Sequence, residues 1–152
     1  MRITKSNINE FTYGDTMDCS NKGITHIEYI PDGITRLYCY DNKLTELPKL
    51  PESLISLDCY NNKLTELPKL PESLTDLHCY SNKLTSLPKL PESLTDLDCE
   101  DNELTELPKL PESLTNLYCR NNNLPYEITI DNYKEKHNKF IKRKLILSRI
   151  CG

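Results

Sequence analysis

Hydrophobic and polar residues alternate along a short stretch that returns every 20 residues. In one copy, Leu57 and Cys59 alternate with Ser56, Asp58 and Tyr60. This period of two is typical of a β-strand with one buried face, so we expect the leucine and the cysteine to point inward. Twenty residues cannot bury such a face alone. Consecutive units must therefore stack, with each strand hydrogen-bonded to the next at a spacing of about 4.8 Å.

The whole 20-residue unit is repeated, and not only its strand. The segment Leu-Pro-Lys-Leu-Pro-Glu-Ser-Leu occurs identically at 47–54, 67–74, 87–94 and 107–114. Units that follow the pattern L-x-x-L-x-C-x-x-N-x-L-x-x-L-P-x-L-P-x-S begin at Ile34, Leu54, Leu74, Leu94 and Leu114. The last of them stops after Leu124, and a sixth, degenerate unit lies upstream. The sequence therefore predicts about six coils between residues 14 and 126.

Two further positions of the unit indicate how each coil turns. An asparagine follows every regular strand, at positions 42, 62, 82, 102 and 122. We expect its amide to point inward and to pair with backbone groups that the bend removes from the sheet, although a solvated turn residue is the alternative. Prolines three residues apart, such as Pro68 and Pro71, remove backbone donors and disfavour helix. The convex arc should therefore be extended or polyproline-like.

The pattern L-x-x-L-x-C-x-x-N-x-L resembles the leucine-rich-repeat signature. The 20-residue unit is similar to the short class of bacterial effector proteins, and also to cysteine-bearing arrays of large DNA viruses of amoebae, which suggests such a virus as a source. The resemblance implies a right-handed solenoid with short parallel strands on its concave face. Some effectors join these repeats to a ubiquitin-ligase domain. Only residues 127 to 152 follow the last repeat here, so we expect no enzymatic activity and no catalytic residues.

Six of the seven cysteines recur every 20 residues, which indicates a repeated packing position and not a disulfide framework. We expect these thiols to be reduced and inert in the core. No metal and no cofactor is expected, because His78 adjoins Cys79 but must point to the opposite face. The chain also lacks an apolar run at its start. These features predict an intracellular protein that lies in the cytoplasm, either of its own cell or of a host cell.

The outward strand positions vary from coil to coil, while the rest of the unit is nearly constant. Tyrosines recur among them and acidic residues surround the tyrosines, a combination that favours contact with a basic protein partner. A tyrosine ladder that only packs on itself is one alternative, and acid–base chemistry by a carboxylate pair is another. The predicted partner-binding residues of the concave face are Tyr38, Tyr40, Asp58, Tyr60, His78, Tyr80, Asp96, Asp98, Glu100, Tyr118 and Arg120.

The two ends of the chain depart from the repeat. Residues 1 to 13 are expected to form an N-terminal edge strand that caps the first coil. Residues 1 to 130 carry 12 basic and 21 acidic residues, a net charge of −9, whereas residues 131 to 152 carry 7 and 2, a net charge of +5. This difference predicts a separate structure for residues 127 to 152.

In that basic tail we expect a helix with Asp131 as its N-cap. One face of the helix would carry Tyr133, His137, Phe140, Ile141, Leu145 and Ser148. We expect Phe140, Ile141 and Leu145 to cover the open end of the last coil. The alternative is an adaptor whose basic helix docks on nucleic acid or an anionic membrane. A monomer is expected in either case.

Overall fold

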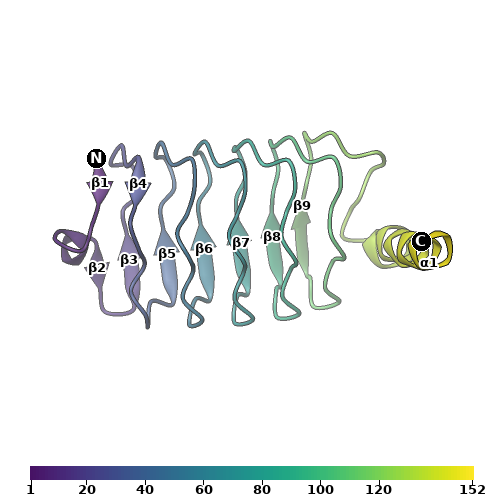
Figure 1. The fold of residues 1–152 in the computed structure, drawn as a ribbon, viewed down its shortest axis with the longest axis horizontal. Coiled ribbons are helices and arrows are strands. Elements are labelled where there is room, and N and C mark those ends of the chain that lie inside the picture. The colour runs from purple at the N-terminus through teal and green to yellow at the C-terminus, as the bar shows by residue number, and fades with distance from the viewer.

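The computed structural model describes residues 1–152 and shows a solenoid of about six stacked coils with one helix at its C-terminal end (Figure 1). Its strands are short, at two or three residues each. In chain order the elements are β1 (Arg2–Ile3), a 3-10 turn (Ile8–Glu10), β2 (Thr12–Tyr13), β3 (Thr16–Asp18), β4 (His26–Ile27), β5 (Arg36–Tyr38), β6 (Ser56–Asp58), β7 (Asp76–His78), β8 (Asp96–Asp98), β9 (Asn116–Tyr118), a π-helix (Tyr133–Asn138) and α1 (Lys139–Cys151).

One strand of each coil joins a single seven-stranded sheet in the order β2-β3-β5-β6-β7-β8-β9. From β3 to β9 all pairs are parallel, and from β5 onward each residue lies opposite the residue 20 positions later. Leu37, Leu57 and Leu77 therefore form one continuous row. The predicted parallel strand per coil is confirmed, and every position of the unit becomes a column along the solenoid.

The core consists of the residues that were predicted to point inward. Leu57 and Cys59 are fully buried, and the equivalent residues of the other coils belong to the same hydrophobic cluster. Burial of one leucine side chain contributes roughly 1.5–3 kcal/mol, so the repeated row supplies most of the driving force for stacking. Between residues 28 and 132 the chain contains no helix, which confirms the extended convex arc that the prolines predict.

The repeated asparagine joins neighbouring coils at the turn after each strand. Asn62 accepts a hydrogen bond from the Leu44 N–H at 2.9 Å and donates to the carbonyl oxygens of Cys39 and Cys59 at 3.0 and 3.1 Å. Asn82 and Asn102 make the same set of contacts. The inward orientation is confirmed, and the solvated-turn alternative is wrong for these residues. Because each side chain bonds to two coils, it fixes the stacking distance as well as the turn.

The N-terminal residues close the first coil differently from the repeat. β2 pairs antiparallel with β3 and forms one edge of the sheet. β1 pairs with β4 in a second, two-stranded sheet. Ile3, Ile8 and Phe11 are buried against the first coil. This end of the core is therefore covered by residues that do not belong to the 20-residue pattern.

The helical tail begins later than expected. Asn132, and not Asp131, directly precedes the helical residues, and it makes no side-chain capping bond to them. Its side chain instead accepts a hydrogen bond from the Thr129 N–H at 2.9 Å, which closes the turn before the helix. The prediction of Asp131 as N-cap is wrong, because the tight turn at residues 129 to 132 uses the next residue.

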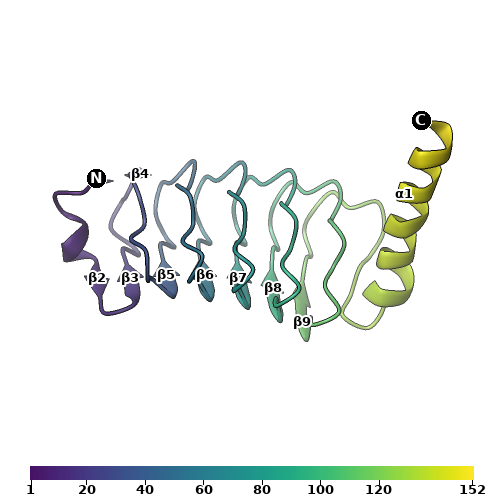
Figure 2. The same cartoon turned by 60° about the horizontal axis from the view of Figure 1, so that its bottom comes forward.

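The residues that cover the last coil also differ from the prediction. Tyr133 and His137 are each 1% exposed, and Ile128 is buried beside them. In contrast, no residue of α1 is buried. The predicted Phe140 and Leu145 are 47% and 55% exposed, and Ile141 is half-buried in a groove beside Leu87 and Leu107. Figure 2 shows that the helix stands alongside the last coil and that its C-terminal end projects past the coil.

Hydrogen bonds hold the covering residues in place. The Tyr133 hydroxyl donates to the Pro111 carbonyl oxygen at 3.1 Å. His137 Nε2 lies 2.8 Å from the Pro108 carbonyl oxygen, and its Nδ1 lies 2.9 Å from the Tyr126 hydroxyl. Neither buried polar side chain is left without a partner. The π-helical turn is thus bonded to the backbone of the last complete proline arc.

Candidate functional site

Three tyrosines form a stacked column on the concave face. The rings of Tyr40 and Tyr60 lie 4.6 Å apart between centroids with an interplanar angle of 6°, and those of Tyr60 and Tyr80 lie 4.4 Å apart at 7°. These separations follow from the spacing of paired strands, since the three residues occupy one column. Burial, followed by the neighbouring Tyr80 and Tyr40, raises the pKa of Tyr60 to about 12. The hydroxyl of Tyr60 therefore remains protonated near neutral pH and can donate a hydrogen bond.

A charged bridge crosses three strands beside this column. His78 Nδ1 lies 2.8 Å from an Asp58 carboxylate oxygen, and Nε2 lies 3.3 Å from an oxygen of Asp96. The hydrogen bond to Asp58 is the largest cause that raises the pKa of His78 to about 9. At neutral pH the imidazolium therefore offsets part of the acidic charge. Its two ring nitrogens also tie β6 and β8 to β7.

Acidic residues continue the surface toward the C-terminal end. The Glu100 backbone N–H donates to the Asp98 carboxylate at 3.2 Å. Burial raises the pKa of Asp98 above its usual range. The bond from the Glu100 N–H opposes this shift, and the charge of the Glu100 carboxylate adds to it. No salt bridge joins Asp98 or Glu100 to a basic residue. This end of the face therefore carries acidic side chains without a salt bridge, and Arg120 follows Glu100 in the same column.

The structure places all eleven predicted residues on the strand face that points away from the core. One column contains Tyr38, Asp58, His78, Asp98 and Tyr118, which are paired in register from β5 to β9. The next column contains Tyr40, Tyr60, Tyr80, Glu100 and Arg120, and Asp96 lies two residues before Asp98. The tyrosines Tyr38 and Tyr118 lie on β5 and β9 and do not join the stack. The His78 bridge itself was not predicted, because it depends on side-chain conformations as well as on the strand register.

The cysteines lie mostly inside the coils, away from this face. All seven cysteines are free, and six of them are buried. Burial raises the pKa of thiols such as Cys59 and Cys79 well above the usual range, so these sulfurs stay protonated. No group of three or more His, Cys, Asp or Glu side chains is arranged to hold a metal ion.

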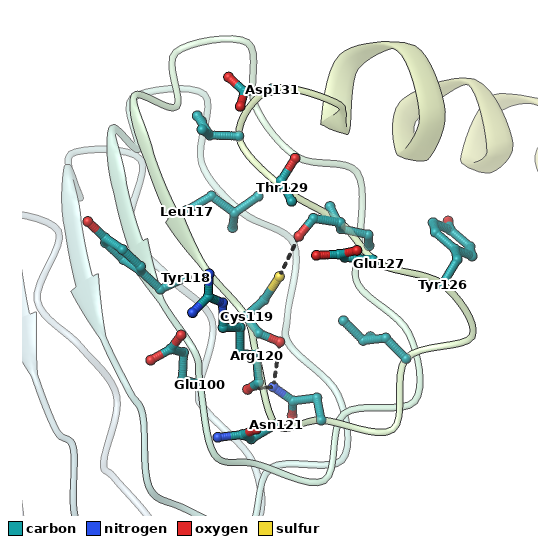
Figure 3. A pocket seen from close by; sticks show the side chains of 14 residues that line it. Glu100, Leu117, Tyr118, Cys119, Arg120, Asn121, Tyr126, Glu127, Thr129 and Asp131 are labelled. Carbon is teal, nitrogen blue, oxygen red and sulfur yellow. Dashed lines mark hydrogen bonds between the residues drawn. The ribbon is translucent and has the colours of Figure 1, made fainter.

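A cavity that sequence reasoning missed lies at the C-terminal end of the sheet. It has a volume of about 560 Å³ and lies between β9 and the loop of residues 124 to 131 (Figure 3). The Cys119 thiol donates to the Ile128 carbonyl oxygen at 3.2 Å across its floor. Charged residues of its lining are Glu100, Arg120, Glu127 and Asp131. The one signal in the sequence for this cavity is that the repeat pattern stops after Leu124, beside the cavity.

The tail helix carries a second group of unassigned surface residues. Phe140, Ile146, Leu147 and Ile150 are exposed large hydrophobic residues of α1. Its basic residues contact acidic side chains only at the surface, for example Lys144 with Glu106 at 3.0 Å. None of the helices is both long enough and apolar enough to span a lipid bilayer.

Comparison with known proteins identifies the fold and its relatives. No protein-family model and no curated protein matches the chain. Solved structures do match, among them YopM from Yersinia enterocolitica WA-314, with 40% identity over 75% of this chain and 26% of that chain and a TM-score of 0.72. A Shigella effector leucine-rich-repeat domain has 34% identity over 84% of this chain and 57% of that chain and a TM-score of 0.74. YopM from Yersinia pestis, a leucine-rich effector protein, has 33% identity over 72% of this chain and 38% of that chain and a TM-score of 0.59.

These structures are all bacterial, so none of them supports the predicted viral source. The chain spans between 26% and 57% of their lengths. The similarity covers the repeats, where the 20-residue unit, the parallel strands and the extended arc agree with the predicted class. The chain is therefore a leucine-rich-repeat protein of the short, 20-residue class, and its solenoid is similar to those of bacterial effector proteins.

Proposed function

We propose that the chain is a non-enzymatic scaffold that binds a protein partner on its concave face. The observation that carries this proposal is the stack of Tyr40, Tyr60 and Tyr80 on an open surface. Tyrosine offers a large contact area with few rotatable bonds, and stacking restrains the rings before a partner arrives. Binding to such a column loses little side-chain entropy. The similarity to effector leucine-rich repeats also supports a protein partner.

The charge beside the column favours a partner with a basic surface. Asp98 and Glu100 have no basic neighbour in a salt bridge, and they lie on the same face as the tyrosines. Opposite charge on a partner would speed its association and fix its orientation, and added salt would slow it. His78 lies in the neighbouring column and offsets the charge of Asp58 and Asp96. We place this interaction inside cells, where six buried thiols remain reduced.

Affinity capture from the source cell tests the proposal with matched variants. The concave variant is Tyr60→Ala/Tyr80→Ala, and the control is the convex variant Lys69→Ala/Lys89→Ala. We expect a partner that binds the unchanged protein and the control but binds the concave variant at least about tenfold more weakly in pairwise titration, since aromatic residues dominate interface energies. Equal binding to all three proteins would contradict the proposal.

The exposed side of α1 favours a second candidate function, in which the tail docks on an anionic surface. Phe140, Leu147 and Ile150 are exposed, and the same helix carries Lys142 and Arg143. Apolar side chains beside basic ones suit the interface of an anionic membrane, where each basic residue contributes about 1 kcal/mol. Nucleic acid would use the basic residues but not the apolar ones.

Vesicle sedimentation distinguishes these outcomes. With phosphatidylserine vesicles we expect binding that falls with salt and is lost both in Lys142→Gln/Arg143→Gln and in Leu147→Ser/Ile150→Ser. Retention on DNA that only the charge variant loses would assign the tail to nucleic acid instead. Binding to neither would leave α1 without this function.

A further inference from the structure

The last strand lacks the backbone partners that interior strands have. In an interior coil the Cys59 N–H donates to the His78 carbonyl oxygen at 2.9 Å, and the Asn61 N–H donates to that of Tyr80 at 3.0 Å. The equivalent N–H groups of Cys119 and Asn121 have no acceptor, because β9 is the edge of the sheet. Edge strands with free donors and acceptors are sites at which a further strand can pair.

The unpaired groups continue beyond the strand into the turn. In an interior coil the Leu64 N–H donates to the Asn82 side chain at 3.0 Å, and the Leu64 carbonyl oxygen accepts from the Lys83 N–H at 2.9 Å. Both backbone groups of Leu124, the equivalent residue, lack such partners. Comparison with the preceding coils therefore shows which backbone groups are free at this end. It also shows which kind of hydrogen-bond partner each of these groups has elsewhere in the solenoid.

The tail covers the core here but does not pair with the strand edge. Its loop contacts the edge through the bond from the Cys119 thiol to Ile128, and the cavity of about 560 Å³ remains beside β9 (Figure 3). At the opposite end of the sheet the chain itself supplies β2, and the Asp18 N–H donates to the Phe11 carbonyl oxygen at 2.8 Å. At the C-terminal edge no segment of the chain pairs with β9 in this way.

We propose that this cavity binds an extended peptide segment of a partner protein, which adds to β9 as a parallel eighth strand. Alternate apolar side chains of the segment would face Leu117 and Cys119, and an asparagine after the strand would accept from the Leu124 N–H. Three acidic residues and one arginine line the cavity, so basic residues at the other positions fit best. This binding mode is independent of the tyrosine column.

The repeat supplies the probe for a direct test. The probe is a labelled synthetic peptide that copies residues 73–84 with the changes Asp76→Lys, His78→Lys and Cys79→Ala. In the protein, the N–H groups of Thr75 and Asp76 donate to the preceding coil, at the Ile55 carbonyl oxygen, whereas the Cys79 N–H donates to the following coil. A peptide bound to β9 would therefore need the first two groups and leave the third in solvent.

N-methylation of the peptide separates these cases without any change to the protein. We expect saturable binding by fluorescence anisotropy, a loss of at least about tenfold when the Thr75 and Asp76 positions are methylated, and a change of less than about twofold when the Cys79 position is methylated. Glu127→Lys should weaken the unmethylated peptide, and Tyr60→Ala should not. The Tyr60 variant thereby keeps this result separate from that of the concave face.

Two results would overturn the proposal. Absence of saturable binding, or equal loss with both methylated peptides, would show that the strand edge is not used. A dimer of the protein that excess peptide fails to dissociate would assign the edge to a second copy of the chain.

Discussion

The interior coils and the C-terminal end are built from the same residues but differ in how many neighbours they have. In the interior, Leu77 and Cys79 are fully buried and Asn82 bonds to the coil before it and to its own. At the end, Leu117 and Cys119 are 9% and 7% exposed and border a cavity. In a solenoid the stability of a unit depends on its own packing and on each adjacent interface. A terminal coil with one repeat neighbour should therefore be less stable, and its free groups are available for binding.

The largest difference is expected when a charge is placed in the cysteine row. Cys79→Asp buries a carboxylate without a partner and should lower the free energy of unfolding by about 3–5 kcal/mol. Cys119→Asp places the carboxylate beside the cavity, where water can reach it, and should cost about half as much. Urea unfolding followed by circular dichroism measures both. Equal losses would mean that the terminal coil is as well packed as the interior.

Removal of the repeated amide should show the same order with smaller effects. Asn82→Ala leaves the buried Leu64 N–H without an acceptor and should cost about 2–3 kcal/mol. Asn122→Ala, in a partly exposed coil, should cost about 1 kcal/mol. Differential scanning calorimetry of the two variants compares them directly. A larger loss for Asn122→Ala would contradict the assignment of weaker stability to the end.

Truncation of the tail at two places identifies its covering part. A chain that stops after Asp131 loses the buried Tyr133 and His137, so it should lose about 2–3 kcal/mol of stability and associate through the exposed core. A chain that stops after Asn138 keeps both residues and loses only α1, none of whose residues is buried. It should remain within about 1 kcal/mol of the full chain. Analytical ultracentrifugation and thermal melts measure the two effects, and similar losses in both chains would show that α1 itself is the cover.

The smallest predicted effect is a pH dependence from the His78 bridge. Folding raises the pKa of His78 to about 9 from an ordinary value of about 6.5. Its contribution to stability is therefore complete below pH 6.5 and is lost as the pH rises toward 9. Between pH 6.5 and 8, before unfolded cysteines titrate, the free energy of unfolding should fall in the unchanged protein and fall less in His78→Gln. If the free energy of unfolding changed with pH by the same amount in the unchanged protein and in His78→Gln, the result would contradict a stabilising bridge at His78.

The repeat made most of the fold predictable, since each position could be compared across five copies. The inward phase of Leu57 and Cys59, the bonded Asn62 and the outward column of Tyr60 all followed from that comparison. The tail has no second copy. Its predicted face assumed a uniform α-helix, but Tyr133 to Asn138 are π-helical, with a different number of residues per turn. Phe140 packs against Tyr126, and Leu145 lines a groove with Leu87 and Leu107, but neither side chain is buried as Tyr133 and His137 are.

The candidate site was predictable in its members and not in their contacts. Alternation alone placed Tyr40, Tyr60 and Tyr80 on the outer face. The 20-residue repeat gives the strand register, but the bridge from His78 to Asp58 and Asp96 also depends on side-chain conformations, which a pattern does not contain. The end cavity depends on the path of the loop after Leu124, where the pattern stops.

Photo-cross-linking in the source cell shows whether a partner binds the concave tyrosine column. A photoreactive benzoylphenylalanine replaces Tyr60 in one protein and the convex Lys69 in another. We expect a specific protein adduct from position 60 and none of that mass from position 69. Adducts from position 69 alone, or from neither position, would contradict a binding surface on the concave face.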